Sequence, residues 1–410
     1  MKPTLIVLSA GQREYREPML RRIAERYSLL LVAPEPVTWE KEHVLASVVV
    51  DPSDTAGFVA AALQLAREYP VAGLFTYDEW CVETAATIGA ALGVPQCAPA
   101  AAARCRDKWA SREAMKRDGV PSAESVLVWS PDEARQAAAR IGYPVVLKPR
   151  ARSASFGVAR VDTVDELPAA FERASSTRPK RAWEHEDGVL VEEYLPGNEI
   201  SVDSVVTGGA PLPVVFARKV LGYPPHFEEI GHIVGAPERV VADPERVREV
   251  VAAAHRALGV DDTVTHTELR LTPSGPRVVE VNGRLGGGLI AELAWLATGV
   301  DIGGAAADVA AGRPATAAAT ATRDRVAGIR FLYAETSGTL VSRQLAGEVA
   351  DAPWVARVQW LAEPGERVRA EPGRRYFARV GFVIVTADSV AGCEARMREA
   401  AQRCTVTVDP

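Results

Sequence analysis

Two glutamates face each other in the stretch HTELRLTPSGPRVVEVNGR, residues 266–284. Two short runs of alternating apolar and polar residues flank a Pro-Ser-Gly turn, and this pattern predicts an antiparallel hairpin. If Thr272 faces Pro276 across a three-residue loop, Glu268 lies directly opposite Glu280. Like charges at opposed positions destabilise a ladder, so we expect something positive between the two carboxylates.

The same register gives the hairpin one ionic face and one apolar face. The ionic face carries His266, Glu268, Arg270, Glu280 and Asn282. The apolar face carries Leu269, Leu271, Val279 and Val281. Opposed Cβ atoms lie about 4.5–5.5 Å apart, so both carboxylates and the Asn282 oxygen can share a divalent ion. Hard oxygen donors suit Mg²⁺ or Mn²⁺ better than zinc. The alternative is a solvated hairpin whose glutamates pair with Arg270 and Arg284.

Three upstream features could bind phosphate, which is the usual further ligand of a carboxylate-bound Mg²⁺. Lys148 ends the apolar strand pattern YPVVLKP. The loop RSASFGV follows, and its residues Ser153, Ser155 and Gly157 could turn backbone N–H groups toward phosphates. Lys108 lies on a charged helical pattern, RCRDKWASREAMKRDG, where a lysine more often faces solvent.

The stretch VLVEEYLPGNEISVD, residues 189–203, could bind a nucleoside. Its first strand pattern ends in Glu192-Glu193-Tyr194-Leu195, and Glu199 follows a Pro-Gly turn. Extended backbone at a strand end can pair with an adenine edge, and a carboxylate can accept hydrogen bonds from ribose hydroxyls. The alternative is an ordinary strand that crosses between domains and carries acidic surface residues.

In this order the segments resemble an ATP-grasp enzyme over about residues 98–310. The matching pieces are DKWASREAMKRDGVP, YPVVLKPRARSASFGV, VLVEEYLPGNEISVD and TELRL…VVEVNGRLGGG. The resemblance implies that Lys108 and Lys148 contact the α- and β-phosphates of ATP, with RSASFGV as a lid over them. It also implies that Glu192 and Leu195 contact adenine and that Glu199 contacts ribose.

The resemblance also implies which positive group lies between the opposed glutamates. Glu268, Glu280 and Asn282 would hold Mg²⁺ or Mn²⁺, and Arg284 would steady the transferred phosphoryl group in catalysis together with Lys148. Such chemistry depends mainly on positioning and on neutralising negative charge.

Within this superfamily the chain is similar to carboxylate–amine ligases, especially L-amino-acid ligases that make dipeptides or related amides. The supporting stretches are FEEIGHIVGAP (227–237), expected as a loop near the acyl substrate, and NGRLGGGLIAELAWLATGVD (282–301). Glu229, His232 and Gly287 are therefore candidate substrate contacts. Equally, Glu229 could be a solvated loop charge and His232 could satisfy the loop backbone.

The resemblance implies a reaction between two small molecules, a carboxylate and an amine. ATP would convert the carboxylate into an acyl phosphate, the amine would displace phosphate, and ADP would be released. Two alternatives share the ATP site: a carboxylase that uses bicarbonate, and a ligase acting on a nucleotide-pathway amine. A non-catalytic nucleotide-binding protein is a third. A dehydrogenase is disfavoured because SAGQRE, after the first strand, lacks the dinucleotide-binding glycines.

The elements that must position these residues predict α/β and α+β architecture. Four β-rich runs, TLIVLSA, SLLLVAP, ASVVVD and VAGLFTY, alternate with helical patterns near 16–27, 55–69 and 79–92, which indicates a doubly wound, Rossmann-like N-terminal domain over 1–97. An ATP-grasp domain follows over 98–312, with a small lid part at about 122–193 and a catalytic part at about 194–312. A C-terminal α+β domain covers 313–410. We also expect one helix over 104–119, a linker at 311–324 and a helix over 389–404.

Composition limits the partners and the compartment. The 410 residues are 48% hydrophobic, carry a net charge of −6 and contain no long Lys/Arg run, which argues against nucleic acid and anionic membranes. No run approaches the roughly 20 apolar residues that span a bilayer. Five scattered cysteines favour a reducing compartment, hence the cytoplasm. Enzymes of the resembled family are often homodimers, which the sequence does not test.

Overall fold

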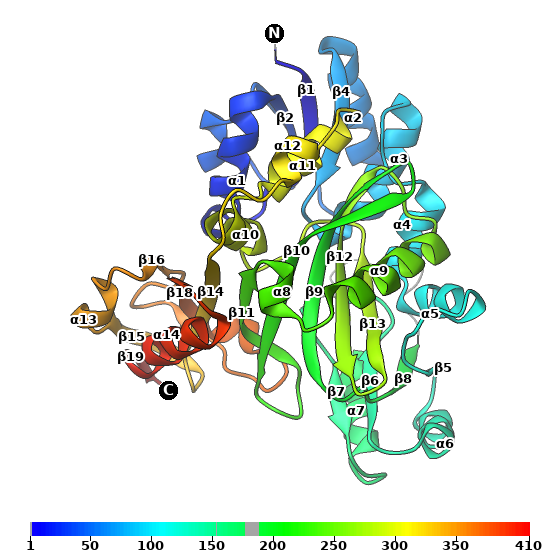
Figure 1. Ribbon diagram of the computed structural model, residues 1–410, viewed down its shortest axis with the longest axis vertical. Helices are drawn as coiled ribbons and strands as arrows, with labels where there is room; N and C mark the ends of the chain where they lie inside the picture. Colours follow the sequence, from blue (N-terminus) through cyan, green and yellow to red (C-terminus); the bar gives the residue numbers. More distant parts are fainter. Residues whose placement is uncertain (1, 153, 177–187) are drawn as a thin grey trace.

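A computed structural model describes residues 2–152, 154–176 and 188–410. The chain begins with a four-stranded parallel sheet in the order β3-β2-β1-β4, flanked by helices (Figure 1). Its strands are β1 (Thr4–Leu8), β2 (Ser28–Ala33), β3 (Ala46–Val49) and β4 (Val71–Thr76). Its helices are α1 (Arg13–Arg26), α2 (Thr55–Glu68) and α3 (Val82–Leu92), with short 3-10 turns at Trp39–Glu42 and Glu79–Cys81. All five residues of β1 are buried, as expected for a strand covered on both faces, so the predicted doubly wound layer is confirmed.

The single helix expected over 104–119 is wrong. The structure has two helices, α4 (Pro99–Arg106) and α5 (Lys108–Arg117), separated at Asp107. Asp107 is extended (φ −93°, ψ 103°), and its side chain accepts a hydrogen bond from the Trp109 N–H and so caps α5. Arg150 binds the same carboxylate at 2.8 and 2.5 Å. The break places Lys108 at the start of α5, where it is buried rather than exposed.

A second unit is a four-stranded antiparallel sheet in the order β5-β8-β6-β7, at the lower right of Figure 1. Its elements are β5 (Ser125–Val128), α6 (Pro131–Ile141), β6 (Val145–Pro149), β7 (Ala159–Val161), α7 (Leu167–Ser176) and β8 (Val189–Glu193). Helices α6 and α7 share a buried apolar cluster with the strands. Val146 pairs with Glu192 and Lys148 with Leu190, so the charged side chains of Lys148 and Glu192 lie on one face.

The largest sheet is antiparallel and has eight strands, in the order β13-β12-β9-β10-β11-β14-β18-β16. These strands are β9 (Asn198–Thr207), β10 (Ala210–Gly222), β11 (Glu228–Gly235), β12 (Thr263–Thr272), β13 (Gly275–Asn282), β14 (Val326–Tyr333), β16 (Val355–Trp360) and β18 (Arg379–Ala387). The loop expected at 227–237 is therefore wrong, because most of it is strand β11. Strand β10 contains Pro211 and Pro213, and a register shift between Pro213 and Val215 accommodates them.

Helices cover this sheet, and a small fourth sheet completes the fold. The helices are α8 (Pro237–Val240), α9 (Pro244–Leu258), α10 (Ile290–Thr298), α11 (Ile302–Ala310), α12 (Thr316–Ala319), α13 (Gly347–Ala350) and α14 (Val390–Gln402). The small sheet has the order β17-β15-β19, from β15 (Gly338–Leu345), β17 (Arg367–Val368) and β19 (Cys404–Asp409), and a 3-10 turn spans Arg375–Ala378. The linker expected at 311–324 contains helix α12, which packs against α11.

One sheet crosses the expected boundary between residues 312 and 313. Strand β11 pairs with β14 from Gly231 opposite Arg330 to Val234 opposite Ala327. The division into three domains remains a proposal, and two of the proposed domains share a continuous ladder.

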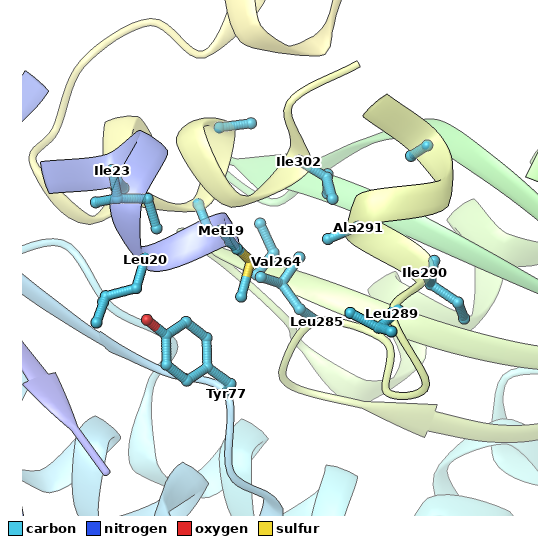
Figure 2. Close-up of a cluster of buried hydrophobic side chains, with 14 of the residues drawn as sticks. Met19, Leu20, Ile23, Tyr77, Val264, Leu285, Leu289, Ile290, Ala291 and Ile302 are labelled. Carbon is cyan, nitrogen blue, oxygen red and sulfur yellow. The ribbon is translucent and has the colours of Figure 1, made fainter. Parts of the chain in front are cut away.

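A buried cluster joins the N-terminal layer to the segment that follows β13 (Figure 2). Side chains of α1 meet those of the 285–302 segment there, and Tyr77 closes one side. The labelled members are Met19, Leu20, Ile23, Tyr77, Val264, Leu285, Leu289, Ile290, Ala291 and Ile302. This packing holds α1 against α10 and α11.

Among the described residues, no single helix is long and apolar enough to cross a membrane. Helices α10 and α11 satisfy the length and composition only when joined across a 112° bend. Most of their side chains belong to the buried core.

Candidate active site

The hairpin brings the two glutamates together as predicted. Glu268 pairs with Glu280 and His266 with Asn282 across β12 and β13. The predicted loop is wrong, because Thr272 faces Gly275 across a two-residue turn. The predicted Glu268–Glu280 pair nevertheless forms, because the register shifts by one residue after Glu268. Leu269 pairs with Val278, and Val279 is an extra residue on β13.

This extra residue changes which valine is in the core. Val278, not Val279, is fully buried in the apolar cluster beneath the sheet. Val279 instead lines the cavity, and its backbone carbonyl accepts a hydrogen bond from Arg112 Nη2 at 2.6 Å.

Each opposed glutamate has a lysine against it. Lys219 Nζ of β10 lies 2.8 Å from Glu268 Oε1, and Lys108 Nζ lies 3.2 Å from Glu280 Oε1. Although burial by itself raises it, the pKa of Glu268 is held well below its usual range by Lys219 and His266. These ammonium groups provide the positive charge that the opposed carboxylates require. The solvated hairpin is therefore excluded, and so is the exposed position considered for Lys108.

Asn282 completes the predicted oxygen set. Its side chain is buried, and its Oδ1 has no hydrogen-bond partner among the described residues. That part of the chain contains no group of three or more His, Cys, Asp or Glu residues arranged to hold a metal ion. The set here is two carboxylates and one amide oxygen, which is a donor set for a hard cation that takes its other ligands from phosphate or water.

Lys148 and Glu192 form a buried ion pair in the wall of the cavity. Lys148 Nζ lies 2.5 Å from Glu192 Oε2, while Arg112 Nε lies 2.8 Å from Glu192 Oε1. Burial lowers the pKa of Lys148 to about 8, even though Glu192 opposes this shift. Burial would also raise the pKa of Glu192, but Arg112 and Lys148 outweigh it and the pKa is lowered.

Glu199 lies between two cations near an aromatic pair. Its carboxylate is 2.8 Å from Lys219 Nζ and 3.1 Å from Arg270 Nε. The rings of Tyr194 and Phe227 stack with centroids 6.4 Å apart, and the Arg270 guanidinium lies 5.4 Å from the Phe227 centroid. Flat apolar surface and hydrogen-bonding groups thus occur together at this end of the cavity.

Arg284 is held by a residue of the N-terminal layer. Its Nε lies 2.5 Å from Glu79 Oε2, and Arg106 Nη1 donates to Glu79 Oε1 at 2.9 Å. Burial raises the pKa of Glu79, but Arg284 and Arg106 outweigh it and lower the value to about 2. Glu79 follows β4 directly, and the carboxyl ends of parallel strands are common positions for ligand contacts.

Glu229 and His232 contact each other near Lys219, whose Nζ lies 3.9 Å from Glu229 Oε2. His232 Nδ1 meets Glu229 Oε1, and the His232 ring is fully buried with Nε2 unpartnered among the described residues. Gly288 presses on the same ring, since a Cβ built there would lie 2.6 Å from His232 Cε1. Gly287 lines the cavity with open space beside it. Glu229 therefore pairs with a histidine rather than standing as a solvated loop charge.

Two of the three predicted lid residues can be placed. Ser155 lines the cavity, Gly157 lies outside its lining, and Ser153 lies outside the described residues. The ring of Phe156, between them, stacks on Phe377 with centroids 5.6 Å apart and planes 8° apart.

One cavity of about 590 Å³ unites most of these groups. The predicted residues that line it are Lys108, Lys148, Ser155, Glu192, Leu195, Glu199, Glu229, Glu268, Glu280, Asn282, Arg284 and Gly287. His232 lies behind the wall. The residues that the sequence reasoning missed include Glu79, Arg112 and Lys219. Lys219 was missed because β10 was not predicted as a strand, whereas the only sequence signal for Glu79 is that it follows a buried strand.

The sequence model of a family described as ATP-grasp domain matches residues 141–292. Residues 141–292 therefore form an ATP-grasp domain. A second model, described as L-amino acid ligase C-terminal domain 2, matches residues 330–409. The predicted resemblance and fold class are confirmed, and ATP-grasp ligases use ATP.

Relatives and solved structures agree with this assignment. Alanine–anticapsin ligase of Bacillus subtilis is 28% identical over 52% of this chain and 48% of the relative, so the match spans about half of that protein. A crystal structure of L-amino acid ligase from Bacillus licheniformis has the same fold, with a TM-score of 0.82 and 22% identity over 100% of this chain and 99% of that one. The biotin carboxylase domain of 2-oxoglutarate carboxylase from Hydrogenobacter thermophilus, solved with MgADP and bicarbonate, has a TM-score of 0.73 and 18% identity over 100% and 91%.

Proposed function

We propose that the protein is an ATP-dependent carboxylate–amine ligase that activates the carboxylate of an amino acid as an acyl phosphate and forms an amide or peptide bond. The main support for this proposal is the cavity in which Glu268 and Glu280 face each other. Lys108, Lys148 and Arg284 line the same cavity. The match of residues 330–409 to an L-amino acid ligase domain supports this choice over a carboxylase.

The ATP contacts follow the charge along the cavity. Lys108 and Lys148 bind the α- and β-phosphates, and the loop around Ser153, Ser155 and Gly157 closes over them. The aromatic end, with Glu192, Leu195 and Glu199, takes the nucleoside. Because Lys148 has one carboxylate partner that it shares with Arg112, its charge remains available to an incoming phosphate.

Glu268, Glu280 and Asn282 would hold Mg²⁺ or Mn²⁺. The fit rests on the buried, unpartnered Asn282 Oδ1 beside two carboxylates. A bound ion would supply charge neutralisation at the β- and γ-phosphates. Lys108 and Lys219, which lie against the glutamates, would add positive charge beside the phosphates.

The proposed reaction has two steps, activation of the carboxylate and attack by the amine. An oxygen of the substrate carboxylate attacks the γ-phosphorus and ADP leaves, which gives the acyl phosphate. The amine nitrogen then attacks the acyl carbon, inorganic phosphate leaves and the amine gives up a proton. Arg284, oriented by Glu79, stabilises the charge on the transferred group, and the lid excludes water that would hydrolyse the acyl phosphate.

Glu229, His232 and Gly287 lie at the acid-substrate end in this proposal. The partners are small molecules, a carboxylate and an amine. We place the enzyme in the cytoplasm, in line with its cysteine usage, and a homodimer remains a prediction from the family resemblance.

Nucleotide product analysis tests the proposal. Purified protein is given ATP, Mg²⁺ and a matrix of amino acids with and without amines, and we expect ADP, phosphate and an amide of matching mass for particular pairs. Glu280→Gln should abolish turnover, whereas Glu249→Gln, on the exposed face of α9, should not. AMP with pyrophosphate would overturn the acyl phosphate, and bicarbonate-dependent ADP release would favour the carboxylase.

A further inference from the structure

Arg379, the first residue of β18, places a guanidinium in the cavity wall among aromatic side chains. Its Nη1 donates to the Tyr15 hydroxyl at 3.1 Å and its Nη2 to the Tyr333 hydroxyl at 3.2 Å. Its Cζ lies 3.4 Å from the centroid of Phe331. Its Nε is buried and has no hydrogen-bond partner among the described residues.

This cation differs in its charge balance from three other arginines that line the cavity. Arg112, Arg270 and Arg284 each lie within 3.1 Å of a glutamate oxygen. In the described part of the chain, no carboxylate lies within 4.0 Å of Arg379. An aromatic face offsets part of the cost of burying a cation, but two neutral hydroxyls do not replace a counter-charge.

The group lies beside the acid-substrate end. The Tyr333 hydroxyl donates to the Glu229 backbone oxygen at 3.0 Å, and the Phe331 and His232 rings are 6.1 Å apart. Arg379, Tyr15 and Tyr333 all line the same cavity as Gly287. They come from β18, α1 and β14, so three rigid elements fix their arrangement.

We propose that Arg379, with Tyr15 and Tyr333, binds a substrate carboxylate other than the one that is activated. A planar guanidinium matches a carboxylate with two parallel hydrogen bonds, and the phenols hold its plane. This inference rests on the proposed function and deepens it, since it assigns a second anionic group to the substrates. That group is either the α-carboxylate of an amino acid acting as the amine or a side-chain carboxylate on the activated amino acid.

Two matched pairs of ligands distinguish the amine-side α-carboxylate from the side-chain carboxylate. Calorimetric titration of the full chain with Mg²⁺ and a non-hydrolysable ATP analogue compares L-alanyl-L-alanine with L-alanyl-L-alaninamide, and L-glutamate with L-glutamine. Because hydrogen bonds to charged groups contribute about 1.5–3 kcal/mol, we expect the carboxylate member of one pair to bind about tenfold or more tightly. A preference in the first pair identifies the amine-side carboxylate, and one in the second identifies the side-chain carboxylate.

Variants test whether Arg379 and Tyr15 cause the preference for the carboxylate ligand. Arg379→Met should remove it and Tyr15→Phe should reduce it several-fold. Arg357→Met is the matched control: Arg357 lies 5.2 Å from the Phe382 ring but outside the cavity lining, and its loss should leave the preference intact. If Arg379→Met does not fold, as judged by circular dichroism, the decision passes to Arg379→Gln and Tyr15→Phe.

No preference in either pair, absence of binding by all four probes, or a preference that survives the Arg379 and Tyr15 changes would overturn the proposal and leave Arg379 as a packing residue. Failure of the ligase is seen separately in the ADP and phosphate assay. A preference for the carboxylate ligand without turnover would reject the ligase activity and keep the carboxylate-binding role of Arg379. Turnover without such a preference would keep the ligase activity and reject that role.

Discussion

At the scale of single residues, two buried lysines of the cavity differ in how firmly they hold their protons. Lys219 lies 2.8 Å from both Glu199 and Glu268, and although burial lowers its pKa, these carboxylates raise it well above the ordinary value. Among the described residues, Lys148 forms an ion pair with Glu192 alone, and Arg112 shares that carboxylate. Burial lowers the pKa of Lys148 to about 8. Its charge is therefore sensitive to pH in the range where the enzyme would be assayed.

We predict that affinity for ATP falls as pH rises through about 8. Below that value the Lys148 ammonium is charged and ready for phosphate, whereas above it the group must take up a proton on binding, so the dissociation constant should rise by up to about tenfold per pH unit. Titration of a non-hydrolysable ATP analogue between pH 7.5 and 9.5 measures this. Lys148→Met should bind weakly at every pH, and Lys116→Met, exposed on α5, should behave like the unaltered protein. Affinity that is constant over this range would contradict the phosphate role of Lys148.

At the scale of elements, the lid loop is attached to the last part of the chain by aromatic contacts. Phe156 stacks on Phe377, which in turn meets Tyr376 edge to face with centroids 5.8 Å apart. Phe377 is 55% exposed, so it contributes little to the core. The stack therefore mainly positions the loop that we propose as a lid.

We predict that Phe377→Ala lowers the amount of amide formed per ADP without unfolding the protein. An aromatic pair contributes about 0.5–1.5 kcal/mol, so its loss should raise the open population of the loop by about two- to tenfold and admit water to the acyl phosphate. The ratio of amide to ADP under saturating substrates is the readout. Trp129→Ala removes another exposed aromatic ring, 61% exposed and outside the cavity lining, and should not alter it. An unchanged ratio for Phe377→Ala would mean that this stack does not control closure.

The elements also show where sequence reasoning succeeds. Strands β1, β2 and β4 were predicted because each is a short apolar run between helical patterns, and the opposed pair Glu268–Glu280 survived a wrong turn because the extra residue Val279 restored the register. Strands β10 and β11 were missed because residues that face the cavity, such as Lys219 and Glu229, interrupt the apolar alternation that identifies a strand. In β10 and β11, strand prediction therefore failed where charged side chains line the cavity.

Contacts between distant segments explain the remaining omissions. Nothing near Glu79 in the sequence indicates Arg284, and nothing near Tyr15 indicates Arg379, since these pairs form only when the N-terminal layer packs on the large sheet. The break at Asp107 has a local signal, because aspartate is a good helix cap, but the charged pattern around it outweighed that signal in the prediction.

At the scale of the whole molecule, the site depends on all parts of the chain at once. Tyr15 and Glu79 come from the N-terminal layer, Lys148 from the four-stranded antiparallel sheet, and Arg379 from the C-terminal part, and all line one cavity. The ladder between β11 and β14 continues the large sheet past residue 312. A boundary drawn there separates neighbouring strands rather than independent cores.

We therefore predict that a fragment of residues 1–312 will not behave as a folded ATP-binding unit. Its loss of β14 leaves the backbone of Gly231–Val234 unpaired, and it exposes Ile233, which is fully buried against residues of β14 and β18. An unpaired apolar edge favours association, so light scattering should show oligomers, and binding of the ATP analogue should be lost. Adding the 313–410 fragment should restore binding, since it supplies the missing strands. A monomeric 1–312 fragment that binds the analogue would show instead that the C-terminal part is a separate domain placed on a complete ATP site.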